Sequence, residues 1–419
     1  MSFHYPKLGE FGKVLMQYAS AQIVSNLIRM LAGFLVVRAI EPEIYGQYIG
    51  VGVYLGYILL GHGGVINGLG RELPYELGRK NDTYAREMAS SVFLLSLIIS
   101  LLAALIFLIL SIWQLINMNY VIGFIYLSYV VMAGLHLLNA QFLPILYRTN
   151  SDFSSLSRQN ILSSLGNLIS VVFVILFGIY GLMARGITLA IFEFFLLFRN
   201  KPYPLTLNYN LKHYKKLLKT GFPIYLVGQI NPLWTTIMNN VIFSIGGALN
   251  FGLYALSAIV QGAVGIIPNA FAQVIYPRMT IMLGEGKSVS SILKSNVKPL
   301  LFQFGVMVSV GIAGVILLPI IIPLILPKYV DGIAAAQWMF FLPAVQSFGA
   351  LNNIYNVIKK QFWYFISLAT GAIVGSMFVY FQVYRYGFYL EVFPQGMLLG
   401  TAIQQILSLI FLINIIRFN

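Results

Sequence analysis

Apolar residues in this chain are gathered into long runs separated by short polar segments. A run of about 20 apolar residues forms a helix that crosses the roughly 30 Å hydrocarbon core of a bilayer. The runs predict twelve transmembrane helices, over residues 14–38, 44–69, 88–112, 120–146, 159–178, 181–198, 220–246, 250–276, 299–326, 332–358, 361–383 and 393–416. Because these runs are continuous and do not alternate with polar residues, they exclude a β-barrel. The predicted fold class is an all-α polytopic membrane protein.

The composition leaves no material for a soluble domain. The chain is 59% hydrophobic and only 9% charged, whereas a soluble protein carries about 25% charged residues. Its net charge of +14 would have to be concentrated on a soluble domain to indicate nucleic-acid binding. There is no cysteine, which excludes disulfides, thiolate nucleophiles and cysteine metal sites.

The positive charges decide the orientation of the spans. With the N-terminus inside, 21 of the 26 Lys and Arg residues fall in the termini and in the inner loops. The exceptions are Arg29, Arg38, Arg185, Lys328 and Arg385. Lys and Arg remain on the cytoplasmic side of a membrane, so we expect both termini in the cytoplasm. The same bias attracts anionic lipid head groups.

The chain looks like two copies of one unit. Gly46 opens the second span and Gly252 opens the eighth, an offset of 206 residues, and Arg71 and Arg278 follow at similar distances. An even number of spans returns the chain to the same side, so the copies should be parallel repeats about an axis along the membrane normal. We expect an N-terminal bundle over residues 1–198 and a C-terminal bundle over 220–419, each with six helices.

Residues 199–219 form the longest predicted inner connection. Leu207, Leu211, Tyr214 and Leu218 recur at helical spacing, with lysines largely off that stripe. This pattern is typical of a basic amphipathic helix on the membrane surface. Its role is either a tether between the bundles or a regulatory one.

Arg29 is the most informative single residue. It lies about 15 residues, or roughly 22 Å, into the first span. An arginine at such depth is costly and usually faces a water-filled cavity or a partner. Gln22, Asn26, Arg29 and Gly33 share one helical face. Since few carboxylates exist to pair with Arg29, we favour a hydrated cavity over a buried ion pair.

We interpret the few acidic residues within or next to the spans as structural. Glu193 is the only acid clearly within a span, and we expect it to neutralise Arg199 or Arg185 rather than to carry protons. Glu41 and Glu43 flank Pro42 in the first outer loop. They could bind a metal, but loop capping and solvation is the better interpretation, so we expect no metal site.

The second copy carries a lining of neutral polar side chains. Such side chains often just form hydrogen bonds between helices, but together, next to prolines, they are typical of a cavity for sugars. The candidates are Asn231, Thr235 and Asn239 in span seven, Asn269 and Gln273 in span eight, and Asn353 in span ten.

The sequence contains almost no residue patterns that are typical of enzyme active sites. There is no Ser–His–Asp spacing, no phosphate-cradling Gly-rich loop and no nucleotide-binding domain. His62 and His136 have no second possible metal ligand nearby in their helices. Hydrogen bonding between packed helices is therefore a better interpretation of both than metal binding or proton transfer. We expect neither an enzyme nor a cofactor, and no direct drive by ATP.

Two stretches of the chain resemble a known family. Residues 36–48 read VVRAIEPEIYGQY, and residues 68–79 read GLGRELPYELGR. These are similar to the end of the first helix and to the first inner loop of polysaccharide flippases. The resemblance is to the O-antigen and exopolysaccharide flippases of the multidrug/oligosaccharidyl-lipid/polysaccharide exporter superfamily.

The resemblance implies a V-shaped pair of six-helix bundles in the bacterial cytoplasmic membrane. It implies that a polyprenyl-diphosphate-linked oligosaccharide moves from the inner to the outer leaflet, with membrane lipids and other polysaccharide-assembly proteins as partners. The family's cationic cavity maps onto Arg29. Few other charges lie at mid-membrane in this sequence, so we do not expect a cavity with several arginines.

Two alternatives remain from the sequence. A drug/cation antiporter of the same superfamily needs carboxylates within the bundles, and Arg29 would repel a cationic cargo. A membrane glycosyltransferase or O-antigen polymerase needs a sizeable outer loop, whereas the outer loops predicted here are short.

The predicted topology can be tested by labelling, because the chain has no native cysteine. Single cysteines at Ser2, Asn210 and Asn419 should resist a membrane-impermeant thiol reagent in intact cells and react after the cells are opened. Labelling of any of the three in intact cells would refute the orientation or the number of spans.

Overall fold

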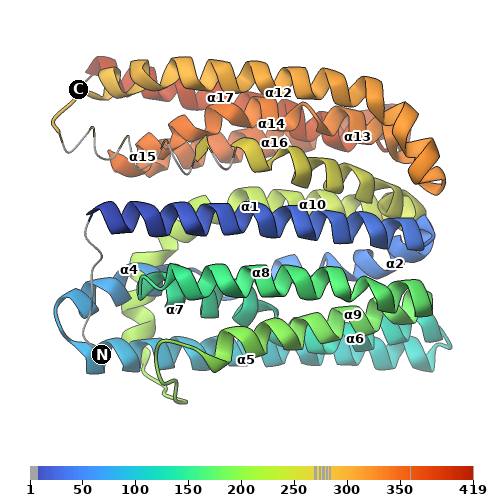
Figure 1. Ribbon diagram of the computed structural model, residues 1–419, viewed down its shortest axis with the longest axis horizontal. Helices are drawn as coiled ribbons and strands as arrows, with labels where there is room; N and C mark the ends of the chain where they lie inside the picture. Colours follow the sequence, from blue (N-terminus) through green and yellow to red (C-terminus); the bar gives the residue numbers. More distant parts are fainter. Residues whose placement is uncertain are drawn as a thin grey trace. The chain divides into compact units, whose positions relative to one another are not determined.

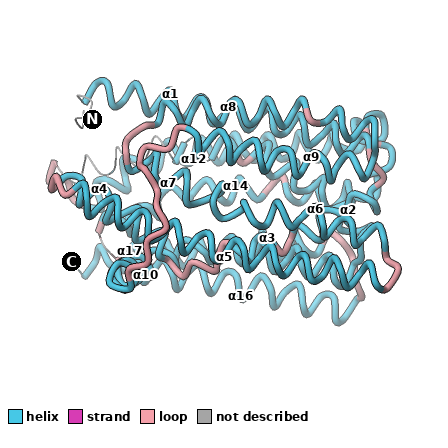
Figure 2. Tube along the Cα trace, turned by 90° about the horizontal axis from the view of Figure 1, so that it is seen from below, coloured by secondary structure: helices cyan, strands magenta, loops and turns pink. Residues whose placement is uncertain are grey.

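The computed structural model describes residues 8–268, 271–272, 275, 279, 282, 285–358 and 360–418. All regular secondary structure in these residues is helical (Figure 2). The helices are α1 (Leu8–Ala39), α2 (Pro42–Gly52), α3 (Leu55–Ile58), α4 (Val65–Gly78), α5 (Asp82–Ile116), α6 (Tyr120–Leu137), the π-helix η1 (Leu138–Phe142), α7 (Leu143–Thr149), α8 (Phe153–Ile169), α9 (Val171–Arg199), α10 (Leu211–Val264), α12 (Val289–Ile325), η2 (Pro327–Gly332), α13 (Ile333–Met339), α14 (Leu342–Gln346), η3 (Ser347–Asn352), α15 (Asn353–Val357), α16 (Gln361–Tyr386) and α17 (Val392–Phe418). Eight helical segments of the described chain are long and apolar enough to cross a membrane.

Two of the long helices each contain a non-helical residue at a predicted boundary between spans. Gly178 within α9 has φ 56° and ψ −125°, and Gly247 within α10 has φ 76° and ψ 179°. Both conformations are ones that glycine adopts readily and other residues do not. Contacts pair residues on opposite sides of each glycine, as in a helical hairpin: Arg185 with Asn167, and the ring of Phe243 with that of Phe251. The fifth and sixth spans thus meet at Gly178, and the seventh and eighth at Gly247.

The second and tenth predicted spans are not continuous helices. The second is divided among α2, α3 and the start of α4, with turns around the sequence Gly61-His62-Gly63-Gly64. The tenth is divided among η2, α13, α14, η3 and α15. Hydropathy reports the length of an apolar run but not whether its backbone is helical throughout. Interrupted backbone at membrane depth occurs where protein or a water-filled cavity surrounds it.

The chain forms two compact units. Unit 1 contains the described residues up to Ile40 together with Gln47–Gln229, and unit 2 contains Glu41–Gly46 together with the described residues from Ile230 onward. In unit 1, α1 lies beside α8 and α5 beside α6, as Figure 1 shows. In unit 2, α16 packs along α17. Residues 199–229 belong to unit 1, and the predicted boundaries at 198 and 220 stay a prediction.

The predicted surface helix is not a separate element. Residues 201–210 have no helix, and α10 begins at Leu211 and continues into the seventh span. Leu207 therefore lies outside the helix that contains Leu211, Tyr214 and Leu218, with which it was predicted to share an apolar face. The first turns of a membrane-spanning helix instead contain four of the five lysines of this segment, Lys212, Lys215, Lys216 and Lys219.

The repeat-related glycines of the two copies contact each other's segments within unit 2. An ideal Cβ on Gly46 would lie 1.8 Å from the carbonyl oxygen of Ala248, and one on Gly252 would lie 1.7 Å from that of Pro42. Pro42 and Ala248 are separated by the same 206 residues as Gly46 and Gly252. Such reciprocal pairs are what a twofold axis produces. The close approach explains why glycine stands at both positions.

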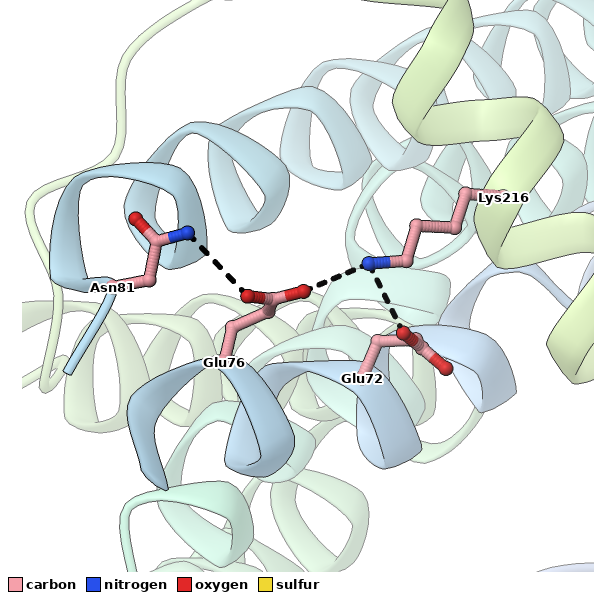
Figure 3. Close-up of polar contacts among 4 residues, drawn as sticks. All are labelled: Glu72, Glu76, Asn81 and Lys216. Carbon is pink, nitrogen blue, oxygen red and sulfur yellow. Dashed lines mark hydrogen bonds and ion pairs between the residues drawn. The ribbon is translucent and has the colours of Figure 1, made fainter. Parts of the chain in front are cut away.

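The first turns of α10 are fixed to α4 by close packing and by charge. An ideal Cβ on Gly68 would lie 2.1 Å from the carbonyl oxygen of Leu217, so the two backbones touch. One and two turns further along α4, Glu72 and Glu76 both contact Lys216: its Nζ lies 3.2 Å from Glu72 Oε2 and 2.8 Å from Glu76 Oε1. Asn81 Nδ2 donates to the other oxygen of Glu76 at 3.4 Å. Figure 3 shows Lys216 reaching from α10 to both carboxylates.

The environment of Glu76 favours its charged form. The hydrogen bond from Lys216 lowers the pKa of Glu76 below its ordinary value, against the effect of burial. Glu76 is only 4% exposed, so its carboxylate depends on these partners. A lowered pKa means that the stabilisation is complete above the ordinary glutamate value of about 4.5 and is lost as the pH falls below it.

We predict that Lys216→Met destabilises the protein by about 1–3 kcal/mol, because it leaves a buried carboxylate unpaired while Lys216 itself is partly solvated. The adjacent and exposed Lys215 offers a matched control, and Lys215→Met should change stability little. Thermal unfolding of the detergent-solubilised protein measures both. The difference between wild type and Lys216→Met should shrink as the pH falls below about 4.5. A difference that is independent of pH would refute the role of the carboxylates.

Candidate functional site

Unit 1 contains an open cavity of about 530 Å³. Its walls come from α1, α6, η1, α7, α8 and α9, with Tyr48 of α2 and Leu55 of α3 also contributing. A volume of this size falls within the usual range for small-molecule sites. The interruption between α2 and α3 therefore lies close to this cavity, where broken backbone is tolerated.

Arg29 lines this cavity, as its depth in the first span predicts. Its Nη2 donates to Ser163 Oγ at 3.5 Å, and Ser163 Oγ in turn donates to Glu193 Oε1. The guanidinium is thus joined to a carboxylate through a hydroxyl. None of the ion pairs in the described part of the chain involves Arg29. The arrangement leaves donors of Arg29 available to a ligand.

The predicted polar stripe of α1 forms a connected network. Gln22 Nε2 donates to Asn26 Oδ1 at 3.2 Å, and Asn160 Nδ2 of α8 donates to Gln22 Oε1 at 3.1 Å. Gln22 and Asn160 line the cavity together with Arg29, and Asn26 supports Gln22 from the same face. The sequence therefore identified this wall, although a role of these residues in binding stays a prediction.

Two further arginines line the same cavity, contrary to the expectation of few charges. Arg185 of α9 donates from Nη2 to Asn167 Oδ1 at 2.8 Å, and Arg148 stands at the end of α7. The expectation was wrong because Arg185 was considered without reference to Arg29, and Arg148 was assigned to an inner loop. The signal available in the sequence was the predicted boundary between spans at Gly178, because a reversal there brings Arg185 back alongside the fifth span.

Glu193 has a different partner from the predicted ones. It accepts from Ser163, whose hydroxyl also contacts Arg29, whereas Arg185 contacts Asn167. The guanidinium of Arg199 lies 5.6 Å from the ring of Phe195. Glu193 is also the only acidic residue among those that line the cavity. With Arg29, Arg148 and Arg185, the lining has a formal net charge of +2.

The neutral candidates of the second copy belong to unit 2. Asn231 is exposed, and Thr235, Asn239 and Asn353 are half-buried. Asn269 and Gln273 lie outside the described residues. The binding role predicted for all six stays a prediction.

Unit 2 instead holds a buried polar cluster that sequence reasoning missed. Asn352 Nδ2 donates to Gln405 Oε1 at 3.0 Å, and Ser408 Oγ donates to Asn352 Oδ1 at 2.5 Å. The signal available was the pair Gln404-Gln405 inside an apolar run.

His136 lines the cavity of unit 1, whereas His62 and Glu41 have structural contacts. His62 Nδ1 accepts from the backbone N–H of Gly64 at 3.0 Å, and its ring packs on Tyr225. Glu41 pairs with Lys328 at 2.5 Å. No group of three or more His, Cys, Asp or Glu residues that could hold a metal ion occurs among the described residues.

The sequence matches a family model over residues 73–326, more than half of its length. That model describes polysaccharide biosynthesis proteins. The chain belongs to this family. A search of curated proteins found no match.

Solved structures with the same fold are transporters of the MOP superfamily. An inward-facing multidrug resistance MATE family transporter superposes with a TM-score of 0.70 at 16% identity, covering 96% of this chain and 98% of that one. An outward-facing MATE transporter gives 0.62 at 17% identity, covering 97% and 96%. A MOP superfamily transporter from Pyrococcus furiosus Vc1, described as having a binding pocket of reverse polarity, gives 0.60 at 15% identity, covering 97% and 96%. This family member is therefore a multi-pass membrane protein with the twelve-helix, two-repeat fold of MOP transporters.

We predict that Glu193→Gln binds inorganic pyrophosphate at least as tightly as the wild type. The amide oxygen of Gln can still accept from Ser163, while loss of the carboxylate raises the formal charge of the lining from +2 to +3. Calorimetric titration of the purified protein measures the affinity. Weaker binding by a variant of normal thermal stability would mean that the carboxylate itself positions the ligand.

Proposed function

We propose that this family member is a flippase. It moves a polyprenyl-diphosphate-linked oligosaccharide from the inner to the outer leaflet of the bacterial cytoplasmic membrane, for O-antigen or exopolysaccharide synthesis. The observation that carries the proposal is the arginine-lined cavity inside unit 1 of a polysaccharide biosynthesis protein with a transporter fold.

The charge of the cavity suits a diphosphate. A diphosphate esterified at both ends has one ionised oxygen on each phosphate, and the lining offers a formal net charge of +2. Arg29 is joined to Glu193 only through Ser163, so its planar donors can pair with phosphate oxygens. Arginine binds such oxygens in a bidentate manner and keeps its charge at all physiological pH values.

The fold supports movement across the bilayer. Repeat proteins of this kind alternate access by rocking one bundle against the other. Polar side chains of the second repeat, among them Asn231, Thr235 and Asn239, would meet sugar hydroxyls along the path, while the lipid tail stays in the bilayer. The bias of Lys and Arg toward one side favours cytoplasmic termini.

The charge of the cavity argues against the main alternative. A drug/cation antiporter needs acidic groups to hold a cationic cargo, and Arg29, Arg148 and Arg185 would repel one. The single carboxylate of Glu193 is already engaged by Ser163.

We predict that Arg29→Ala lowers transport at least tenfold, because a charge-assisted hydrogen bond is worth about 1.5–3 kcal/mol. Arg29→Lys should retain part of the activity, since a point charge lacks the planar fork, and Arg29→Glu should be the most severe change. Surface polysaccharide in a host deleted for this gene measures transport.

Arg38→Ala is the matched control for this experiment. Arg38 lies on the same helix but is exposed in its last turn and does not line the cavity. It should complement fully, with membrane protein levels checked in parallel. Full complementation by a well-inserted Arg29→Ala would refute the proposed mechanism.

A further inference from the structure

The cavity of unit 1 is placed asymmetrically along its helices. We call outer the end of unit 1 that carries the reversal at Gly178 and the turn between α5 and α6; two spans separate these reversals, so they lie at the same end. On α9 the lining begins at Arg185, roughly 10 Å from Gly178, and continues to Leu197 near the end of the helix. On the fourth span it begins at Met132, roughly 18 Å from the start of α6, and continues to Arg148 in the last turn of α7. The cavity therefore reaches the inner end of the unit and stops short of its outer end.

Tyr48 lies where the cavity stops. It lines the cavity and is only 6% exposed, and it stands in α2 roughly 9 Å from Pro42, where that helix begins. Its hydroxyl donates to Met132 Sδ at 3.6 Å. An ideal Cβ on Gly186 would lie 2.3 Å from the same hydroxyl, so the glycine leaves the space that the tyrosine occupies. Helices α2, α6 and α9 thus meet at this one side chain.

The ring of Tyr48 is supported from the α5–α6 side. Its centroid lies 5.2 Å from that of Tyr129, and the hydroxyl of Tyr129 donates to the backbone carbonyl of Tyr48 at 3.1 Å. Tyr129 in turn stacks on Phe107 of α5 at 5.9 Å. Tyr48 is therefore held between these aromatic rings and α9. Truncation of such a buried ring leaves a gap, because the surroundings relax only partly.

Helix α2 links this contact to the other unit. Residues Glu41–Gly46 belong to unit 2, whereas the chain from Gln47 onward belongs to unit 1. The chain thus passes from one unit to the other within a helix, two residues before Tyr48. After α2 the backbone is irregular at residues 53–54 and 59–64, and such positions can absorb a change of backbone direction. A displacement of Glu41–Gly46 would therefore move Tyr48 before it reached α4.

We propose that Tyr48 is a gate that closes the outer end of the cavity of unit 1. In this conformation its side chain fills the space between α6 and α9, and a ligand reaches Arg29 from the inner end. Withdrawal of Tyr48 with α2 opens the outer end. The gate depends on the proposed function only for the direction in which the cargo leaves, because it would act on any polar cargo held in this cavity.

The test uses a single reporter cysteine, since the chain has no native one. Ala190 lines the cavity one turn further from the outer end than Gly186. In right-side-out and inside-out membrane vesicles, a membrane-impermeant thiol reagent should label Ala190→Cys from the inner side and not from the outer side. In Tyr48→Ala, labelling from the outer side should become at least about tenfold faster, because the gap left by the ring admits the reagent. A separate Asn117→Cys variant, in the exposed turn between α5 and α6, identifies the outer side in each preparation.

Two further variants make the test specific. Tyr54→Ala is the matched control, because Tyr54 directly follows α2 in the sequence but is 37% exposed and does not line the cavity. It should leave the labelling of Ala190→Cys unchanged. Tyr48→Leu keeps an apolar side chain against Tyr129 but lacks the outer part of the ring, so it should also open the outer end. It provides the test if Tyr48→Ala does not insert into the membrane.

Three outcomes would overturn the gate: labelling from the outer side as fast as from the inner side while Tyr48 is present, absence of labelling from the inner side, or protection that persists in a well-inserted Tyr48 variant. Opening by Tyr54→Ala to the same extent would also overturn it. Failure of the wild type to bind inorganic pyrophosphate in a calorimetric titration would contradict the proposed function instead. It would leave the gate standing, because the labelling experiment needs no ligand.

Discussion

Hydrocarbon provides no water to solvate a charge or a free backbone group, and unit 1 is organised around this constraint. Arg29 and Arg185, which both lie within its spans, line one cavity. The irregular backbone of the fourth span, at η1, lies on the same cavity. Interrupted helices and ionised side chains thus occur together, because both require the surroundings that a polar cavity supplies.

Glycine makes this architecture possible at two kinds of position. Gly178 and Gly247 reverse the chain with backbone angles that other residues rarely adopt. Gly46 and Gly252 let repeat-related segments touch, backbone against backbone, in a reciprocal pattern. Without hydrophobic attraction between helices in lipid, such close packing is a main source of association. The sequence repeat at an offset of 206 residues is therefore visible as a symmetric contact.

The sequence predicts those features that depend on one segment at a time. It identified the twelve spans, the reversal near Gly178 and the exposure of Arg29 to a polar environment. It could not identify the partners of Glu193 or Arg185, because these depend on how α8 and α9 align after the reversal. It also predicted a continuous second span and a surface helix including Leu207, since apolar spacing does not report where a helix ends. The amides of the second copy were chosen by pattern alone, and the structure leaves their role open to experiment.

The indirect link between Arg29 and Glu193 fits a site that must bind and then release. A direct ion pair in a low-dielectric cavity would have to be broken at considerable cost before a phosphate could bind. A complete absence of acid would leave the arginines so strongly cationic that a bound diphosphate would leave slowly. Ser163 places a neutral hydroxyl between the two charges, so a phosphate oxygen can take its place beside Arg29. A ligand shifts a conformational equilibrium only by its difference in affinity between the two states. In the proposed flippase, moderate binding in this cavity would therefore allow such a difference in affinity to drive the conformational change.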